Sequence, residues 1–70
     1  MTDLDSAMIR AHDSGDLKAL ITLYTQAADR AKTLDAACFF LTHAYIFALE
    51  AGAFEAADLH ARLIAHGREA

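Results

Sequence analysis

The order of apolar and polar positions along the chain predicts four α-helices. Apolar residues recur at the i, i+3, i+4, i+7 spacing that places them on one face of a helix. In the first helix, for which Thr2 or Asp3 is the expected N-cap, this stripe is Leu4, Ala7, Met8 and Ala11. The segment "SGD" at 14–16 then predicts a break, because glycine tolerates left-handed backbone and serine and aspartate favour N-caps.

The second predicted helix runs from about Leu17 to Lys32. Its apolar face, widened by Leu23, is Leu17, Leu20, Ile21, Tyr24, Ala27, Ala28 and Ala31. The third helix is expected to begin after Asp35 as its N-cap, with Leu34 and Phe39 as a hydrophobic staple. It is expected to end at Gly52 as the C-cap glycine.

The fourth predicted helix extends from Ala53 or Phe54 to about His66 and ends at Gly67. Its expected apolar stripe, flanked by Leu59 and Leu63, is Phe54, Ala57, Ala61 and Ile64. Asp58 and Arg62 have the i, i+4 spacing of a weak ion pair on a solvated face.

The third helix is the most apolar part of the chain. From Ala36 to Leu49 there are 14 consecutive residues without a formal charge, bracketed by Asp35 and Glu50. Because a membrane span needs about 18 to 20 apolar residues, we expect a core or interface helix and no membrane partner. One stripe of the helix is Cys38, Leu41, Tyr45, Ala48 and Leu49, with Phe39, Phe40, Ile46 and Phe47 spread round the other sides. A helix that is apolar all round has neighbours all round.

The short connections predict that consecutive helices fold back on each other. The expected fold is therefore all-α, with residues 1–70 forming one domain of two antiparallel helical hairpins. The segments "GDLKALITLYTQA" and "GAFEAADLHARLI" align when Gly15 is placed over Gly52, an offset of 37 residues. The shared order is a glycine, a bulky apolar residue, small residues and an apolar face, which indicates a weak internal repeat.

At these residues the chain resembles the tetratricopeptide-repeat (TPR) superfamily, whose unit is a pair of antiparallel helices. Gly15, Leu17, Tyr24 and Ala27 match the repeat pattern better than Gly52, Phe54 and Ala57 do. The offset of 37 residues is longer than the usual repeat, and no proline closes either unit. The resemblance implies a concave groove that binds a protein or peptide partner, for which Thr42 and Tyr45 are the candidate residues.

Two repeats are fewer than the three or so that such arrays need for stability. The second and fourth helices cover only part of the third, so we expect another chain to cover the rest. A twofold homodimer is the commonest arrangement of this kind. The candidate interface residues are Phe39, Phe40, His43, Ile46 and Phe47.

Composition narrows the possible partners. The hydrophobic share is 56%, whereas globular domains have about 45 to 50%. The net charge is −4 with scattered basic residues, which predicts no nucleic-acid partner and no anionic membrane surface. The single cysteine, Cys38, excludes an internal disulfide and fits a reducing compartment, and the start of the chain does not read as a signal peptide. We expect a cytoplasmic protein.

Motifs for enzymatic chemistry are absent from the sequence. There is no nucleophile-elbow, phosphate-loop, dinucleotide-binding or HExxH pattern. Cys38 and His43 are five residues apart and diverge by about 140° on a helix. His60 and His66 lie on different faces, so no metal or cofactor is predicted. The prediction is a protein-interaction module and not an enzyme; the alternative is a small-ligand or enzymatic bundle with a pocket near Cys38, His43 and Tyr45.

Overall fold

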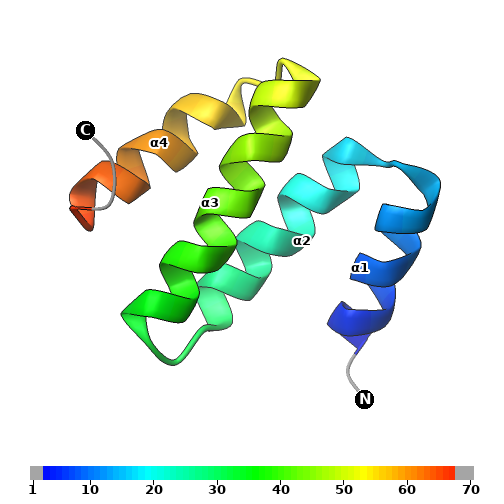
Figure 1. Ribbon diagram of the computed structural model, residues 1–70, viewed down its shortest axis with the longest axis horizontal. Helices are drawn as coiled ribbons and strands as arrows, with labels where there is room; N and C mark the ends of the chain where they lie inside the picture. Colours follow the sequence, from blue (N-terminus) through cyan, green and yellow to red (C-terminus); the bar gives the residue numbers. More distant parts are fainter. Residues whose placement is uncertain (1–2, 68–70) are drawn as a thin grey trace.

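Four helices contain almost all of the residues that the structure describes, 3–67 (Figure 1). In this computed structural model their bounds are α1 Asp3–Ser14, α2 Leu17–Arg30, α3 Leu34–Ala51 and α4 Glu55–Ala65. No strand occurs between residues 3 and 67, so the all-α prediction is confirmed. Each helix packs against the next one along the chain, as two successive hairpins require, and α2 and α3 share the most extensive contact.

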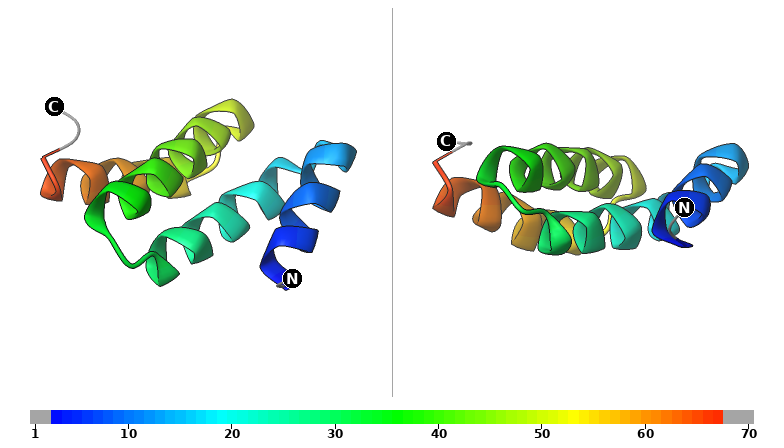
Figure 2. Two further views of the ribbon diagram at one scale, coloured as in Figure 1. Left: turned by 60° about the horizontal axis from the view of Figure 1, so that its bottom comes forward. Right: turned by 90° about the horizontal axis from the view of Figure 1, so that it is seen from below.

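The four helices form a thin plate, in which α3 lies on one face and α2 and α4 lie on the other. Seen edge-on in the right-hand view of Figure 2, α3 lies above α2 and α4. The Cα atoms extend 32 × 29 × 12 Å, and because packed helix axes lie about 8–10 Å apart, the shortest dimension has room for α3 over α2 and α4 but for no third layer. The side of α3 that faces away from α2 and α4 therefore has no further layer of the described structure over it.

The core lies between α2, α3 and α4. Its buried residues are Ile21 and Ala28 from α2, Cys38, Leu41, Ala44 and Ala48 from α3, and Leu59 and Leu63 from α4. Alanines at the helix contacts let the backbones approach closely, so three short helices enclose the leucines completely. Of the α3 stripe expected from the sequence, Cys38, Leu41 and Ala48 are buried, whereas Leu49 is exposed.

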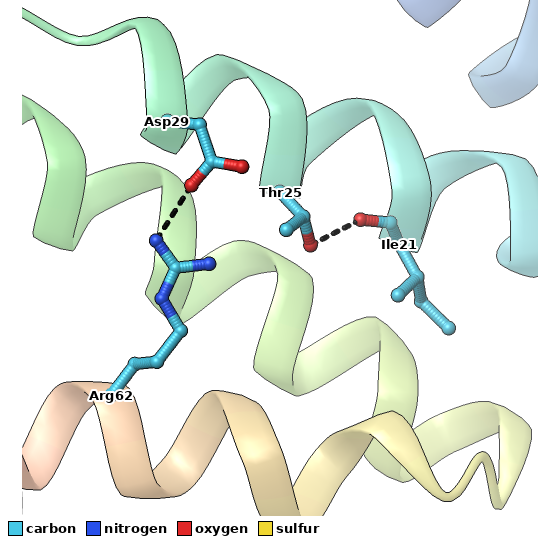
Figure 3. Close-up of polar contacts among 4 residues, drawn as sticks. All are labelled: Ile21, Thr25, Asp29 and Arg62. Atoms are coloured by element: carbon cyan, nitrogen blue, oxygen red, sulfur yellow. Dashed lines mark hydrogen bonds and ion pairs between the residues drawn. The ribbon is translucent and has the colours of Figure 1, made fainter.

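An ion pair also joins α2 and α4 (Figure 3). The Arg62 guanidinium donates to Asp29 Oδ1 at 2.7 Å, beside Thr25, whose hydroxyl donates to the Ile21 carbonyl at 2.7 Å. The predicted pairing of Arg62 with Asp58 within α4 is wrong. Arg62 pairs with Asp29 of α2 instead, because α2 and α4 lie on the same side of the plate.

Side-chain caps and glycines set the helix ends. Asp16 Oδ1 accepts from the Ala19 N–H at 3.1 Å, which confirms it as the cap of α2. Gly52 has φ 65°, and the following Ala53 N–H donates to the Ala48 carbonyl at 2.9 Å, which confirms the predicted end of α3. A positive φ of this kind is unfavourable for residues with a Cβ.

The start of α3 and the end of α2 differ from the prediction. Thr33 is the N-cap of α3, because its hydroxyl accepts from the Ala36 N–H at 3.1 Å. Asp35 is not the cap; it lies in the first turn, where its negative charge complements the helix dipole. Leu34 is then helical, so the predicted staple is in the wrong register. Helix α2 ends at Arg30 instead of Lys32, and Thr2, the other candidate cap of α1, lies outside the described residues.

Helix α4 buries a different side from the one predicted. It begins at Glu55, and the expected stripe of Phe54, Ala57, Ala61 and Ile64 is exposed to solvent. The flanking residues Leu59 and Leu63 form the core instead. Both sides of α4 carry apolar residues, and the side with Leu59 and Leu63 is the one that packs with the core residues of α3. The predicted stripe is left without a neighbour in the described structure.

Candidate functional site

The apolar side chains of α3 point to different neighbours. Among the five predicted interface residues, Phe39 and Ile46 are exposed, whereas Phe40, His43 and Phe47 are half-buried. The exposed pair lies on the side of α3 that faces away from the core. The half-buried three follow an i, i+3, i+7 spacing and contact aromatic side chains of other helices. The structure therefore does not bring the five residues onto one surface.

The exposed side of α3 is an apolar strip along the helix. We call Phe39, Thr42, Ile46 and Leu49 the outer stripe of α3. The exposed fractions of its large side chains are 56% for Phe39, 46% for Ile46 and 56% for Leu49. The Thr42 hydroxyl donates to the Cys38 carbonyl at 2.8 Å, so its hydrogen bond is made within the helix. The stripe therefore presents an almost wholly apolar face to its surroundings.

Exposed large apolar residues are concentrated in the C-terminal half of the described chain. Ile9 is the exception in α1. The others all fall between residues 34 and 64: Leu34, Phe39, Ile46, Leu49, Phe54 and Ile64. Single exposed apolar residues are normal on a protein surface, but several on one helix face indicate an interaction site, and Phe39, Ile46 and Leu49 share one face of α3.

A ring cluster lies beside the outer stripe, where α1, α2 and α3 meet. We use this name for His12, Tyr24, Phe40, His43 and Phe47. Tyr24 is at its centre, with ring centroids 5.5 Å from His43, 5.4 Å from Phe47 and 6.1 Å from Phe40. His12 contacts Phe47 edge-on at 5.8 Å. The cluster attaches the end of α1 to the rest of the fold, because aromatic pairs each contribute about 0.5–1.5 kcal/mol beyond area burial.

The two histidines of the ring cluster also make polar contacts. His12 Nε2 and the Tyr24 hydroxyl lie 2.9 Å apart, joining α1 to α2. His43 Nδ1 lies 3.0 Å from the Phe39 carbonyl. A carbonyl oxygen only accepts, so His43 Nδ1 carries the hydrogen of this bond. Both histidines hold other groups in place here, and the cluster itself was not predicted from the sequence.

The two predicted groove residues lie apart. Thr42 belongs to the outer stripe of α3. Tyr45 lies towards α4, where its ring stacks on His60 with centroids 5.2 Å apart and planes at 10°. A shallow hollow of about 370 Å³ brings Cys38 and His43 to one place with Asp35, Phe39 and Thr42, but Tyr45 does not line it. The pocket of the alternative hypothesis therefore lacks one of its three residues.

Other chemistry in the described residues is sparse. A larger hollow of about 690 Å³ lies between α1 and α2, and its charged lining residues are Arg10, Asp16 and Lys18. No group of three His, Cys, Asp or Glu side chains within residues 3–67 is placed to hold a metal ion. Cys38 is a free thiol that is only 4% exposed.

Helix α3 is long and apolar enough, by length and composition alone, to cross a membrane. The helix has 18 residues, four more than the uncharged run from Ala36 to Leu49. Within this helix, 22% of the residues are buried. The core helix of a water-soluble protein passes the same test of length and composition, but most of such a helix is buried. In this fold α3 packs on α2 and α4 through its buried side, and the outer stripe together with Leu34 forms its exposed apolar surface.

Comparison with known proteins assigns no relative to this chain: no family model, no curated protein and no solved structure matches it. The tetratricopeptide resemblance therefore rests on the residues alone.

Proposed function

We propose that this chain is a small protein-interaction module that self-associates through the outer stripe of α3 as a twofold homodimer. One observation carries the proposal. The central helix of the plate exposes Phe39, Ile46 and Leu49 side by side, and nothing in the described structure covers them.

The energetics favour an occupied surface. Full burial of a Phe, Leu or Ile side chain contributes about 1.5–3 kcal/mol. About half of each of these three side chains is exposed, so a partner recovers roughly half of that value for each residue in each copy. In a twofold dimer six side chains contribute, which offsets a large part of the cost of association.

A second copy of the chain is the proposed partner. The exposed apolar residues of this chain lie mostly between residues 34 and 64, so each copy carries a patch suited to the other. A twofold axis lets such a patch close on itself and leaves no unsatisfied surface. A stable dimer buries about 800 Å² on each partner, roughly a sixth of the 4503 Å² that the chain exposes.

The helical array is consistent with the tetratricopeptide resemblance, which remains part of the proposal. Gly15 and Gly52 occupy equivalent positions after the first helix of each hairpin, with φ values of 67° and 65°. Each helix packs on its neighbour in the chain, as in a repeat array. The described residues form two hairpins, and self-association gives this short array a further helical neighbour.

The test is the mass of the native chain across a concentration series, by sedimentation equilibrium. We expect a reversible increase from 7.6 kDa to twice that mass as concentration rises through the micromolar range. A mass of 7.6 kDa at every concentration contradicts the proposal. Binding of that monomer to phosphatidylcholine vesicles would instead assign the outer stripe of α3 to a lipid surface.

A further inference from the structure

We propose that the outer stripe of α3 packs against α4 of a second copy in antiparallel orientation, and that the reciprocal contact forms at the same time. The result is a four-helix bundle made of two α3–α4 hairpins. This inference rests on the proposed self-association and names the surface that it uses. The receiving surface, which we call the outer stripe of α4, consists of Phe54, Ala57, Ala61 and Ile64.

The outer stripe of α4 is open to solvent. Phe54 is 83% exposed and Ile64 is 45% exposed. Ala57 and Ala61, which lie between them, are exposed as well. By contrast, the exposed residues of α2 are polar: Lys18, Thr22, Gln26, Asp29 and Arg30. Within the described structure, α3 and α4 are therefore the helices that carry apolar stripes on their free sides.

The two stripes have the same geometry. Each residue of the outer stripe of α3 is followed 15 residues later by a residue of the outer stripe of α4. The corresponding pairs are Phe39 and Phe54, Thr42 and Ala57, Ile46 and Ala61, and Leu49 and Ile64. The same step relates Tyr45 to His60, which stack on each other inside the hairpin. At about 100° per residue, the middle of each stripe lies about 80° round its helix from this stacked residue. Each helix of a four-helix bundle needs two neighbours at roughly this angle.

Side-chain size favours pairing of α3 with α4. In the antiparallel register, the residue numbers of facing pairs add to 103, so Ile46 lies opposite Ala57 and Thr42 opposite Ala61. At the ends of the contact Phe39 faces Ile64 and Leu49 faces Phe54, and in the middle Ile46 and Thr42, which are larger than alanine, fill the space opposite Ala57 and Ala61. Pairing of α4 with α4 would place Ala57 opposite Ala61 while Phe54 and Ile64 hold the helix ends apart. Such a contact leaves a void.

Charge favours the same pairing. Antiparallel packing of α3 on α4 places His43 of one copy within about two residues, or about 3 Å along the axis, of Asp58 in the other. Pairing of α4 with α4 would set Asp58 against Asp58 at a similar offset. Pairing of α3 with α3 would bring Asp35 towards Glu50, because the stripe has an acid at each end. The mixed pairing sets the His43 imidazole beside the Asp58 carboxylate. It also brings Glu50 within two residues of Glu55 of the other copy, but Glu55 lies about 140° round α4 from the middle of the outer stripe and points away from the contact.

The reciprocal contact follows from the hairpin. Helix α4 lies on the Tyr45 side of α3, and α3 lies on the His60 side of α4. When α3 of one copy packs antiparallel on α4 of the second copy, the Tyr45 side of this α3 and the His60 side of this α4 face in the same direction. Helix α4 of the first copy and α3 of the second copy then lie next to each other, and their outer stripes face each other. Helix directions alternate round the bundle, and the twofold axis runs along it.

Disulfide cross-linking between two differently labelled chains tests this inference. Both chains carry Cys38→Ala, which removes the native thiol, and both new cysteines replace exposed residues. One chain carries Thr42→Cys and the other Ala61→Cys; they are mixed, allowed to exchange and oxidised. We expect a covalent heterodimer, because a disulfide needs Cα atoms within about 7 Å. The matched control mixes Thr42→Cys with Ile46→Cys, which face each other only if α3 packs on α3, and we expect no cross-link there.

Each outcome is decisive when the mass of the unoxidised mixture is also measured. Cross-linking in the first mixture alone supports the inference. Cross-linking in the control mixture alone overturns it and leaves the proposed self-association standing. A dimeric mass without either cross-link likewise overturns the inference and not the self-association. A monomeric mass before oxidation overturns both.

Discussion

Replacing Ile46 with aspartate is the change expected to weaken self-association most clearly. Ile46 lies in the middle of the outer stripe of α3, is 46% exposed and does not belong to the core cluster of the monomer. Phe47, which the sequence also placed at the interface, is less suitable. Its ring contacts Tyr24 and His12, so a change there would disturb the fold as well as any interface.

The magnitude follows from the exposed fraction. Complete burial of an isoleucine side chain contributes about 1.5–3 kcal/mol. The exposed 46% of Ile46 accounts for about 0.7–1.4 kcal/mol in each copy, and a twofold dimer loses it twice. A loss of about 1.4–2.8 kcal/mol raises the dimer dissociation constant by about 10- to 100-fold. Two carboxylates placed against apolar side chains add to this effect, so we expect at least the upper value.

The assay is sedimentation equilibrium of both proteins across a concentration series. The matched control is Ile9→Asp, which makes the same chemical change at an exposed isoleucine of α1 with 60% exposure. We expect the control to change the dissociation constant less than about twofold. Helix content measured by circular dichroism confirms that both variants fold. An unchanged dissociation constant for Ile46→Asp, or an equal effect of Ile9→Asp, would refute the reasoning.

Other predictions test how the monomer is held together. Thr33→Ala is expected to lower the free energy of unfolding by about 1 kcal/mol in urea titration, whereas Thr33→Ser keeps the capping oxygen and should change it little. Gly52→Ala has open space for its Cβ but keeps a φ of 65°, so thermal unfolding should show a loss of about 1–2 kcal/mol. Tyr24→Phe removes the hydroxyl that contacts His12 and keeps the ring, so a loss above about 1.5 kcal/mol in urea would contradict the exposed character of that bond. Cys38 should react slowly with a thiol reagent until denaturant is added, and rapid reaction of the native protein would contradict its burial.

Local sequence patterns predicted the helices and several of their ends. Gly52 ends α3 as expected because a left-handed residue at that position favours glycine in any context. Asp16 caps α2 for a similarly local reason. The cap of α3 was misplaced because Thr33 and Asp35 both suit an N-cap. Only the extended backbone at Thr33 decides between them.

The packing of α4 depended on information that its sequence does not contain. One side carries Phe54 and Ile64, and the other carries Leu59 and Leu63. Both have helical spacing, and hydropathy alone does not rank them. The choice is made by the space between α2 and α3, which accepts the two leucines together with Cys38, Leu41 and Ala44.

The candidate site was predictable in part. The apolar excess of α3 correctly indicated that this small chain could not cover the whole helix, and Phe39 and Ile46 are exposed. The ring cluster was not predicted, because it brings His12 and Tyr24 to α3 from separate helices. Its one local signal was the i, i+3, i+7 spacing of Phe40, His43 and Phe47.

The central claim is that the outer stripe of α3 is buried against a second copy. Isotope-filtered NMR on a mixture of ¹³C-labelled and unlabelled chains tests it most directly, because only contacts between copies give a signal. We expect intermolecular nuclear Overhauser effects from the Ile46 and Leu49 methyl groups, and none from those of Ile9. Intermolecular signals from Ile9 alone, or none at a concentration where the mass is dimeric, would contradict the account.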